Sequence, residues 1–358
     1  MAGNELETNE IETDNKLDIA INQGINYLEH RQLPNGEFLM YMSGDDAMQG
    51  WNLPESCVFP AALIGNCLLP LRKKENVELI LQEAAKFLHY QMDRGGTWNH
   101  YTILHRLRHL CPQDLDDTAC VSQFLKTMNF DFPSRRNQQL ILDNRRSDGL
   151  FYTWIIFRWR LNKNLLYWYY AVKELKHFVK SLIFWYKFEC SRYDVDAAVN
   201  ANVLFYLGKR KETQPIISYL ISIINENKEK DCDKWYLNEF TIYYFISRNF
   251  HIGIYELEII RTKMISKIIL QHQKNGGFGE SELDTALAIT ALINLNYKGL
   301  EIKEGINYLI KNQSKNGNWK RWAFYYTGPT GSCLGSEELT TAFCLEALGR
   351  FKDLKKIE

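Results

Sequence analysis

The sequence predicts an all-α protein with a single (α/α)6 barrel, in which six helical hairpins form a closed ring. Three observations favour this fold. A turn motif built on Gln, Gly and an aromatic residue recurs along the 358 residues, as in chains assembled from repeated units. Proline is scarce, with 8 residues, which favours long uninterrupted helices. The alternation of apolar and polar residues that marks strands is nearly absent.

The repeated motif ends one helix and turns the chain back. Its two strongest copies are Gly24–Phe38 and Gly305–Trp319, and weaker copies are Phe87–Trp98 and Ile269–Phe278. The glycines permit a positive φ after a helix C-terminus. We expect the glutamine to bond backbone at the start of the next helix, and the aromatic residue to pack on the neighbouring hairpin.

A second helix follows each turn and begins with acidic, Ser or Thr residues, which cap free amides and meet the positive end of the helix dipole. These starts are Pro54–Cys57, Asp114–Ala119, Asp194–Ala198, Glu282–Ala286 and Glu337–Ala342, with a weaker sixth from Asp233 to about Phe245. The predicted hairpins are 15–70, 76–129, 147–207, 212–249, 255–296 and 301–350. Residues 15–358 thus form one domain, with the inner helix starts at one mouth of a central cavity. A flexible acidic tail at 1–14 precedes it, and an aromatic, basic insertion lies near 151–190.

Composition and charge indicate a cytoplasmic protein. The 43 Lys and Arg residues balance 43 Asp and Glu, so the formal net charge is zero, and no nucleic acid is expected as a partner. No uncharged apolar stretch reaches the length of about 18 residues that a spanning helix needs, and the polar N-terminus matches no targeting peptide. The eight scattered cysteines indicate reduced, mostly buried thiols. The oligomeric state stays open.

The repeated turn resembles the QW motif of squalene-hopene and oxidosqualene cyclases and of related terpene cyclase domains. The segment Asp114–Asp117 resembles the DxDD signature of class II, protonation-initiated cyclases. The resemblance implies the barrel of a single-domain class II terpene cyclase, a fold that protein prenyltransferase β-subunits share. The residues that match the QW motif are Gly305, Tyr308, Leu309, Gln313, Gly317 and Trp319, and also Gln32, Gly36 and Phe38, with Phe in place of Trp.

The three aspartates suit an acid catalyst. In the resembled family the middle acid donates the proton, which assigns that role to Asp116, with Asp114 and Asp117 holding or polarising it. A helix N-terminus lowers the pKa of a lone carboxyl, whereas adjacent carboxylates oppose this, because several anions cannot share a dry site. N-capping is the alternative role for acidic helix starts, although three carboxylates in four positions exceed what a cap uses.

A carbocation also needs aromatic faces that stabilise it without trapping it as water would. Aromatic residues make up 13% of the chain, and several lie near predicted helix starts or turns. Ordinary core packing is the alternative role for each of them. The candidates for a cation-stabilising cavity are Trp51, Trp98, Trp154, Tyr236, Trp322 and Tyr326.

Head-group contacts are predicted from four charged residues. Asp45 and Asp46 could bind Mg²⁺ with a diphosphate substrate, and Lys320 and Arg321 could contact phosphate oxygens; ordinary solvated charges are the alternative. No DDxxD motif is present, so departure of a diphosphate is not predicted. The proton transfer itself requires no cofactor.

His100, His105 and His109 are close enough in sequence to suggest zinc, but no Glu or Cys stands at the required spacing. We therefore predict no metal ligands. One of these histidines could instead bond to the aspartate cluster and tune its acidity, or all three could be surface or capping residues.

The insertion near 151–190 carries seven Lys and Arg residues against two Glu, with several Trp and Tyr. Basic amphipathic helices of this kind can lie on a membrane surface, and squalene-type cyclases take their substrates from membranes. Peripheral membrane contact and an extra outer helix packed on the barrel are both open.

The resemblance predicts protonation-initiated cyclisation of a linear isoprenoid in a dry aromatic cavity. Squalene cyclases use two barrel domains and this chain has length for one, so we expect a sesquiterpene- or diterpene-sized substrate, as the diphosphate or another derivative. One alternative is a zinc protein like the prenyltransferase β-subunits, although Asp231–Asp233 does not match their spacing. The other is a non-catalytic barrel that binds an isoprenoid or a partner protein.

Overall fold

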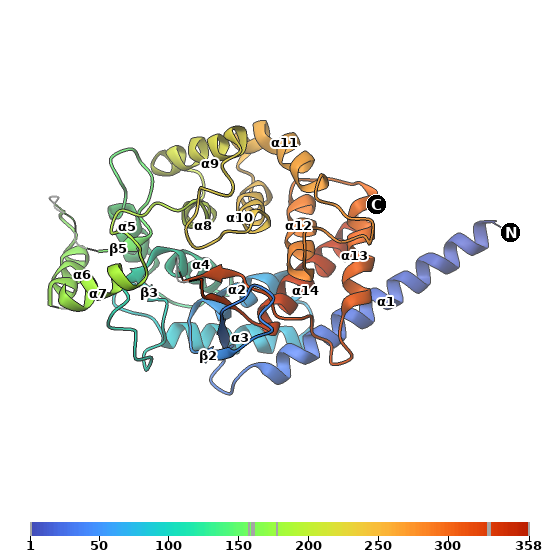
Figure 1. Cartoon of the computed structure of the whole chain (residues 1–358), viewed down its shortest axis with the longest axis horizontal. Helices are drawn as coiled ribbons and strands as arrows, with labels where there is room; N and C mark the ends of the chain where they lie inside the picture. The colour runs from blue at the N-terminus through green and yellow to red at the C-terminus, as the bar shows by residue number, and fades with distance from the viewer. Residues whose placement is uncertain (1, 157, 159–161, 177, 328–330, 357–358) are drawn as a thin grey trace.

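Two concentric rings of helices make up the computed structural model, which describes residues 2–156, 158, 162–176, 178–327 and 331–356 (Figure 1). Within these residues, the inner ring consists of α2 (Phe59–Leu68), α4 (Leu115–Thr127), α8 (Ala197–Leu207), α10 (Glu239–His251), α12 (Glu282–Asn294) and α14 (Glu337–Lys355). The outer ring consists of α1 (Ala2–Arg31), α3 (Glu75–Tyr90), α5 (Ser134–Asp143), α9 (Gln214–Glu226), α11 (Glu258–Ile269) and α13 (Leu300–Asn312). Short 3₁₀ turns cover Leu69–Leu71, Lys211–Thr213 and Tyr255–Leu257.

The inner ring is closed, as predicted for an (α/α)6 barrel. Its helices contact one another in the cyclic order α2, α4, α8, α10, α12 and α14, and α14 packs back on α2. All ten residues of α2 are buried, whereas α3 buries one stripe of residues at helical spacing. A helix that is apolar all round belongs in an interior, and an amphipathic one belongs at its edge. The inner helices therefore form the core, and the outer helices separate it from solvent.

Short strands cover one end of the ring. β1 (Met40–Ser43), β2 (Asn52–Glu55), β7 (Cys333–Gly335) and β6 (Tyr325–Tyr326) pair in the order β2-β1-β7-β6, and β3 (Trp98–Asn99), β4 (Gln113–Asp114) and β5 (Trp154–Ile155) pair in the order β3-β4-β5. The β1–β7 pairing joins the first and last hairpins. β4 leads directly into α4, and a single residue, Ser336, separates β7 from α14. These strands thus fix where inner helices begin, but they are too short to show alternation in the sequence.

The two strongest turn motifs have one geometry. Gln32 Nε2 donates to Gly36 O (3.1 Å) and to Ile80 O in α3 (3.0 Å). Gln313 Nε2 donates to Gly317 O (2.8 Å) and to Ala20 O in α1 (2.9 Å). Each glutamine therefore ties its own turn to the body of the next outer helix, rather than to the start of a helix.

The aromatic residue of the motif is fixed by its own hairpin. The indole nitrogen of Trp319 donates to Leu309 O (2.8 Å), and that of Trp98 donates to Leu88 O (2.7 Å). The backbone N–H of Trp98 donates to the hydroxyl of Thr118 in α4 (3.1 Å). Both tryptophans are fully buried, so these side chains hold the outer helix, the turn and the inner helix together.

Two boundaries differ from the predicted ones. Residues 2–14, for which the sequence predicts a flexible tail, are the first turns of α1, which projects from the barrel (Figure 1). The absence of proline from 2–31 agrees with this continuous helix. The third outer helix is α5, which lies before the predicted hairpin 147–207. It was missed because its only buried residues are Asn137, Leu140 and Ile141, too few for a clear helical stripe.

The predicted insertion forms two helices, α6 (Leu165–Lys176) and α7 (Phe178–Lys187), on one side of the ring (Figure 1). Residues 157, 159–161 and 177 of this segment lie outside the described residues. Tyr170 donates its hydroxyl to Arg94 O (2.6 Å) and lies 2.5 Å from the Thr97 hydroxyl. The insertion is therefore attached to the turn that precedes α4.

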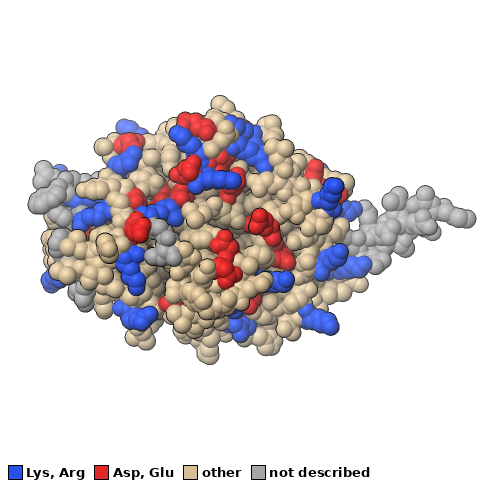
Figure 2. Space-filling view, in the orientation of Figure 1, with Lys and Arg blue, Asp and Glu red and all other residues tan. Residues whose placement is uncertain are grey.

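Positive and negative side chains are interspersed on the face shown in Figure 2, in keeping with a net charge of zero. The eight cysteines are free, and all except the half-buried Cys232 are buried. Among the described residues, no helix combines the length and the apolar character needed to cross a bilayer.

Gly317 tests the turn geometry. Its φ is +91°, and a Cβ there would lie 2.3 Å from the carbonyl oxygen of Gln23, whereas Gly253 has a φ of +84° and only ordinary contacts at 3.8 Å and beyond. We expect Gly253→Ala to lower the free energy of unfolding by roughly 1–2 kcal/mol for the positive φ, and Gly317→Ala to lose about 1–3 kcal/mol more for the clash. Urea unfolding curves measure both, and equal losses would contradict this account of the turn.

Candidate active site

Three aspartates begin α4, and only one of them caps the helix. Asp114 has an extended backbone, and its carboxylate accepts hydrogen bonds from the N–H groups of Asp116 (2.7 Å) and Asp117 (3.4 Å). These bonds satisfy amides that have no partner within the first turn. Asp116 and Asp117 make other contacts, so N-capping accounts for one carboxyl group of the three.

Asp116 is 6% exposed, and each of its carboxyl oxygens accepts a hydrogen bond from a neutral donor. The Tyr236 hydroxyl donates to Oδ2 (2.6 Å), and the Asn202 amide donates to Oδ1 (2.5 Å). Asn202 lies in α8, and Tyr236 lies just before α10. Hydrogen bonds of this kind favour a carboxylate over a carboxylic acid, so they stabilise the group that remains after Asp116 loses a proton.

Burial works in the opposite direction. It raises the pKa of Asp116 to about 6, against the hydrogen bonds from Tyr236 and Asn202. Burial, followed by the charges of Asp117 and Asp116, raises the pKa of Asp114 well above its usual range. Because a dry cluster of three carboxyl groups does not hold three negative charges, the cluster retains a proton near neutral pH.

His100 provides a counter-charge for the cluster. Its Nδ1 lies 3.4 Å from Asp117 Oδ2, and its Nε2 lies 3.2 Å from the Tyr325 hydroxyl. Burial disfavours the charged imidazole, but Cys57 and Asp117 outweigh it and raise the pKa of His100 well above its usual range. One of the three histidines therefore bonds to the aspartate cluster, whereas His105 pairs with Glu55 (2.7 Å).

Arg248 lies behind Asp116 and orients the amide of Asn202. It is 3% exposed, and its guanidinium donates to Asn202 Oδ1, which leaves the amide N–H₂ for Asp116. The positive charge of Arg248 also lowers the pKa of Asp116. The guanidinium lies 4.6–5.2 Å from the ring centroids of Phe205, Phe245 and Tyr244.

A second buried carboxyl positions the residues opposite α4. Asp233 accepts hydrogen bonds from the N–H groups of Ala198 (2.9 Å), Trp235 (2.9 Å) and Tyr236 (3.0 Å). It thereby fixes the segment that carries the Tyr236 hydroxyl to Asp116. This bonding explains the weak helix start predicted at Asp233: the N-cap of α10 is Asn238, whose side chain accepts from Phe240 N (2.8 Å).

A cavity of about 300 Å³ opens above the aspartates. Residues at or near the starts of α2, α4, α8, α10 and α14 line it, so these helices begin at the same end of the ring, as predicted. The three aspartates are among the lining residues. The aromatic lining comprises Phe59, Tyr101, Trp154, Phe184, Phe188, Trp235, Tyr236, Tyr325 and Tyr326.

The insertion supplies one wall of this cavity. The Trp154 ring meets Phe184 of α7 edge to face, with centroids 5.2 Å apart, and also meets Trp235 edge to face at 5.7 Å. Trp154 and Phe184 are each 3% exposed. The sequence suggested a membrane contact or an added outer helix for this segment, and it did not reveal that α7 borders the cavity.

Of the six aromatic residues predicted for the cavity, Trp154, Tyr236 and Tyr326 line it, and Trp51, Trp98 and Trp322 do not. Trp98 belongs to the turn described above. Trp51 is 55% exposed, and the indole of Trp322 donates to Glu282 Oε2 (2.8 Å). Sequence position near a helix start does not fix the direction of a side chain, which is why half of this set lies elsewhere.

The four predicted head-group residues also lie outside the cavity lining. The carboxylate of Asp45 accepts hydrogen bonds from Gln49 N and Gly50 N (3.0 Å each), which is a turn-forming role, and Tyr326 donates to Asp46. Arg321 pairs with Glu337 (2.7 Å), and Lys320 is exposed. These contacts do not fit a magnesium–diphosphate site.

In the part of the chain that the structure describes, no group of three or more His, Cys, Asp and Glu side chains could hold a metal ion. Cys232, which would belong to a zinc site of the prenyltransferase kind, directs its thiol to Glu229 O (3.3 Å).

Sequence reasoning missed Asn202 and Arg248. A usable signal was present, because Asn202 interrupts the otherwise apolar second half of Ala197–Leu207, and Arg248 comes shortly after the apolar and aromatic run Ile242–Ile246. Polar residues within a buried helix require partners. Asn202 accepts from Arg248 and donates to the carboxyl group of Asp116, however, and only the closed ring brings these three side chains within reach of one another.

The fold is that of solved all-α terpene cyclases. Type II terpene cyclase MstE from Scytonema matches with a TM-score of 0.69 at 14% identity, over 95% of this chain and 99% of that one. A variant of MstE in complex with geranylgeranyl dihydroxybenzoate, its substrate, gives a TM-score of 0.67 at 14% identity, over 94% and 97% of the two chains.

A further match is ent-copalyl diphosphate synthase from Streptomyces platensis, with a TM-score of 0.52 at 14% identity, in which 82% of this chain corresponds to 50% of that one. No protein-family model and no curated protein sequence matches this chain. At these identities the comparisons establish a shared fold, and the chemistry has to be argued from the site.

Proposed function

We propose that this protein is a class II terpene cyclase, which protonates a linear isoprenoid and guides its cyclisation inside the barrel. One observation carries the proposal: Asp116, a buried carboxyl group with a raised pKa, borders an aromatic cavity and has neutral donors on both oxygens. The match between Asp114–Asp117 and the DxDD signature supports it, as does the likeness to MstE.

The reaction starts with transfer of the Asp116 proton to the terminal alkene, or to an epoxide, of the bound chain. An O–H bond of the carboxyl group breaks as a C–H (or epoxide O–H) bond forms, and a carbocation and a carboxylate result. Hydrogen bonds from Tyr236 and Asn202 stabilise that carboxylate. Because these bonds strengthen as negative charge develops, they lower the barrier to proton transfer.

Ring closure then proceeds by attack of internal double bonds on the cation, and loss of a proton from carbon ends it. The rings of Trp154, Tyr236 and Tyr326 stabilise the positive charge, and the apolar cavity keeps water from it. Solvent returns a proton to Asp116, so the net reaction from an alkene is an isomerisation that leaves the head group in place. Asp114 and Asp117 hold the acid in position and oppose its early ionisation.

The substrate is a sesquiterpene- or diterpene-sized chain. A volume of about 300 Å³ is at the lower end of the range for ligand pockets, and MstE acts on a geranylgeranyl derivative. Proton transfer needs no cofactor, and Mg²⁺ would enter only as the counter-ion of a diphosphate substrate.

Substitution of the acid tests the proposal. We expect the wild-type protein, incubated with farnesyl and geranylgeranyl diphosphates or the corresponding alcohols, to give a cyclic product that keeps its head group. Asp116→Asn should reduce the rate at least about 100-fold, the lower range of a general acid's contribution. Gas chromatography–mass spectrometry identifies the products, and a circular dichroism spectrum like that of the wild type shows that the variant is folded.

Asp114→Asn is the variant with which Asp116→Asn is compared. It removes a carboxyl group of the same cluster, and the Asn side chain can still accept the capping hydrogen bonds. Cyclic product formed at the wild-type rate by folded Asp116→Asn would remove Asp116 from the acid role. Unchanged linear isoprenoid from every incubation would contradict the proposal and favour the non-catalytic barrel.

The pH dependence tests the pKa of the acid. Since the donor must be protonated and its pKa is about 6, kcat/KM should be highest below pH 6 and fall up to tenfold per unit above it. Tyr236→Phe keeps the ring but removes a hydrogen bond that lowers the pKa of Asp116, so its profile should shift to higher pH. Tyr326→Phe, which removes a bond to Asp46 instead, should leave the midpoint unchanged. If the pH profiles of both variants had the same midpoint, the assignment of the titrating group to Asp116 would be contradicted.

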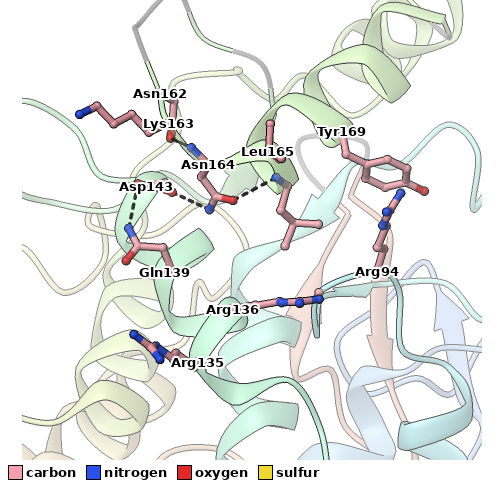
Figure 3. A pocket seen from close by; sticks show the side chains of 12 residues that line it. Arg94, Arg135, Arg136, Gln139, Asp143, Asn162, Lys163, Asn164, Leu165 and Tyr169 are labelled. Carbon is pink, nitrogen blue, oxygen red and sulfur yellow. Dashed lines mark hydrogen bonds between the residues drawn. The ribbon is translucent and has the colours of Figure 1, made fainter.

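We also propose that the outer face of α6 and α7 contacts an anionic membrane surface. Leu165, Val172, Leu175, Val179, Leu182, Ile183 and Tyr186 are each at least 50% exposed there. A groove beside Leu165 is lined by Arg94, Arg135, Arg136 and Lys163 against one acidic residue, Asp143. Figure 3 shows these cations around the groove, with Arg94 next to Tyr169. Apolar side chains flanked by cations suit the interface of an anionic bilayer.

Flotation with liposomes tests this contact. Vesicles with about one-fifth phosphatidylserine should carry the protein, and pure phosphatidylcholine vesicles should carry less of it. Leu182→Glu should lower the membrane-bound fraction roughly tenfold, since it places a charge where an apolar side chain would enter the bilayer interface. Leu300→Glu should not, although this leucine of α13 is even more exposed (65% against 50%). Equal flotation of both variants would contradict the contact through α6 and α7.

A further inference from the structure

Two cations lie where the cavity meets solvent. Arg106, in the loop between β3 and β4, and Lys187, the last residue of α7, both line the cavity and are both exposed. Asp116, also in the lining, is 6% exposed. One cavity therefore has an acid at its buried part and two positive charges at its open part.

These cations have no carboxylate partner. Among the described residues, neither Arg106 nor Lys187 lies within ion-pair distance of Asp or Glu, whereas the nearby Arg108 pairs with Asp93 (2.8 Å). Glu55, the one glutamate in the lining, is occupied by His105 at 2.7 Å. The positive charge at the mouth is thus available to a ligand.

The adjoining wall contains hydrogen-bond donors without acceptors. The indole N–H groups of Trp154 and Trp235 are buried and have no partner among the described residues. Both side chains belong to the lining. Buried donors in a folded protein are nearly always paired, so two unpaired ones on the same wall call for an acceptor, and a ligand oxygen is a suitable one.

We propose that Arg106 and Lys187 bind an anionic head group of the isoprenoid, a diphosphate or a carboxylate, and so direct the far end of the chain toward Asp116. This inference rests on the proposed function and extends it to the substrate class. Charge-assisted hydrogen bonds from Arg and Lys to such oxyanions are stronger than neutral ones, and the apolar stretch between the two ends accepts the hydrocarbon. If the head group entered the cavity first, its negative charge would lie among three aspartates. The charges of the cavity therefore favour the orientation with the head group at the mouth.

The insertion then has a part in recognition. Lys187 ends α7, and Phe184 and Phe188 beside it line the same cavity. The end of α7 and the residue after it would thereby supply a cation for the head group and aromatic rings for the chain.

Binding to the folded Asp116→Asn protein tests the inference, because that variant binds substrate without consuming it. Isothermal titration calorimetry in the presence of EDTA would compare farnesyl diphosphate, farnesoic acid and farnesol, and then the geranylgeranyl series. We expect the anionic ligands to bind at least about tenfold more tightly than the alcohol, and rising salt to reduce that difference. Adding Arg106→Gln or Lys187→Gln should weaken anion binding roughly tenfold and leave alcohol binding unchanged.

Lys320→Gln is the matched control, since Lys320 is an exposed cation outside the cavity, and it should change no affinity. Equal affinities for the alcohol and the anions, or a loss with Lys320→Gln as large as that with Arg106→Gln, would overturn the head-group assignment. If wild-type protein still cyclises farnesol, the proposed function survives that result. Absence of binding by every isoprenoid would overturn both.

Discussion

The site is organised around one buried carboxyl group, that of Asp116, whose pKa is raised by burial and lowered by the hydrogen bonds it accepts. Asp116 is placed in the first turn of a helix, where the dipole favours an anion, and it accepts hydrogen bonds from Tyr236 and Asn202. Burial opposes these effects, and the pKa reaches about 6. In the proposed reaction, these hydrogen bonds stabilise the carboxylate that forms on proton transfer, whereas burial and the charge of Asp117 keep the carboxyl group protonated before it.

The closed ring brings burial and hydrogen-bond donors from separate helices together at the carboxyl group of Asp116. Asp116 belongs to α4, Asn202 to α8 and Arg248 to α10, and adjacent inner helices pack directly on one another. Each helix contributes one polar side chain to a chain of contacts from Arg248 through Asn202 to Asp116. On an open array of hairpins the ends of such a chain would be exposed to water, and screening would remove much of the effect of Arg248.

The sequence predicted those features that depend on residues close together in the chain. The Gln–Gly–aromatic turns were predictable because a positive φ and the hydrogen bonds of Gln32 and Gln313 leave few other residues possible. The aspartate cluster was predictable because three acids exceed what one N-cap uses. The direction of Trp51 or Trp98, and the pairing of Asn202 with Asp116 across 86 positions, depend on the packing of distant hairpins. The outer helix α5 escaped because it buries few residues.

The aromatic side chains of the cavity wall have fixed orientations. Trp154 is held edge to face by both Phe184 and Trp235, so its orientation is fixed by partners from the insertion and from the loop before α10. Asp233, by binding the N–H groups of Trp235 and Tyr236, fixes that loop. The indole of Trp235, which packs on Trp154, and the Tyr236 hydroxyl, which bonds to Asp116, are therefore positioned by the same buried carboxyl group. In the proposed reaction, a displacement of this loop would disturb proton donation and cation stabilisation together, so Asp233 would link the first step structurally to those that follow.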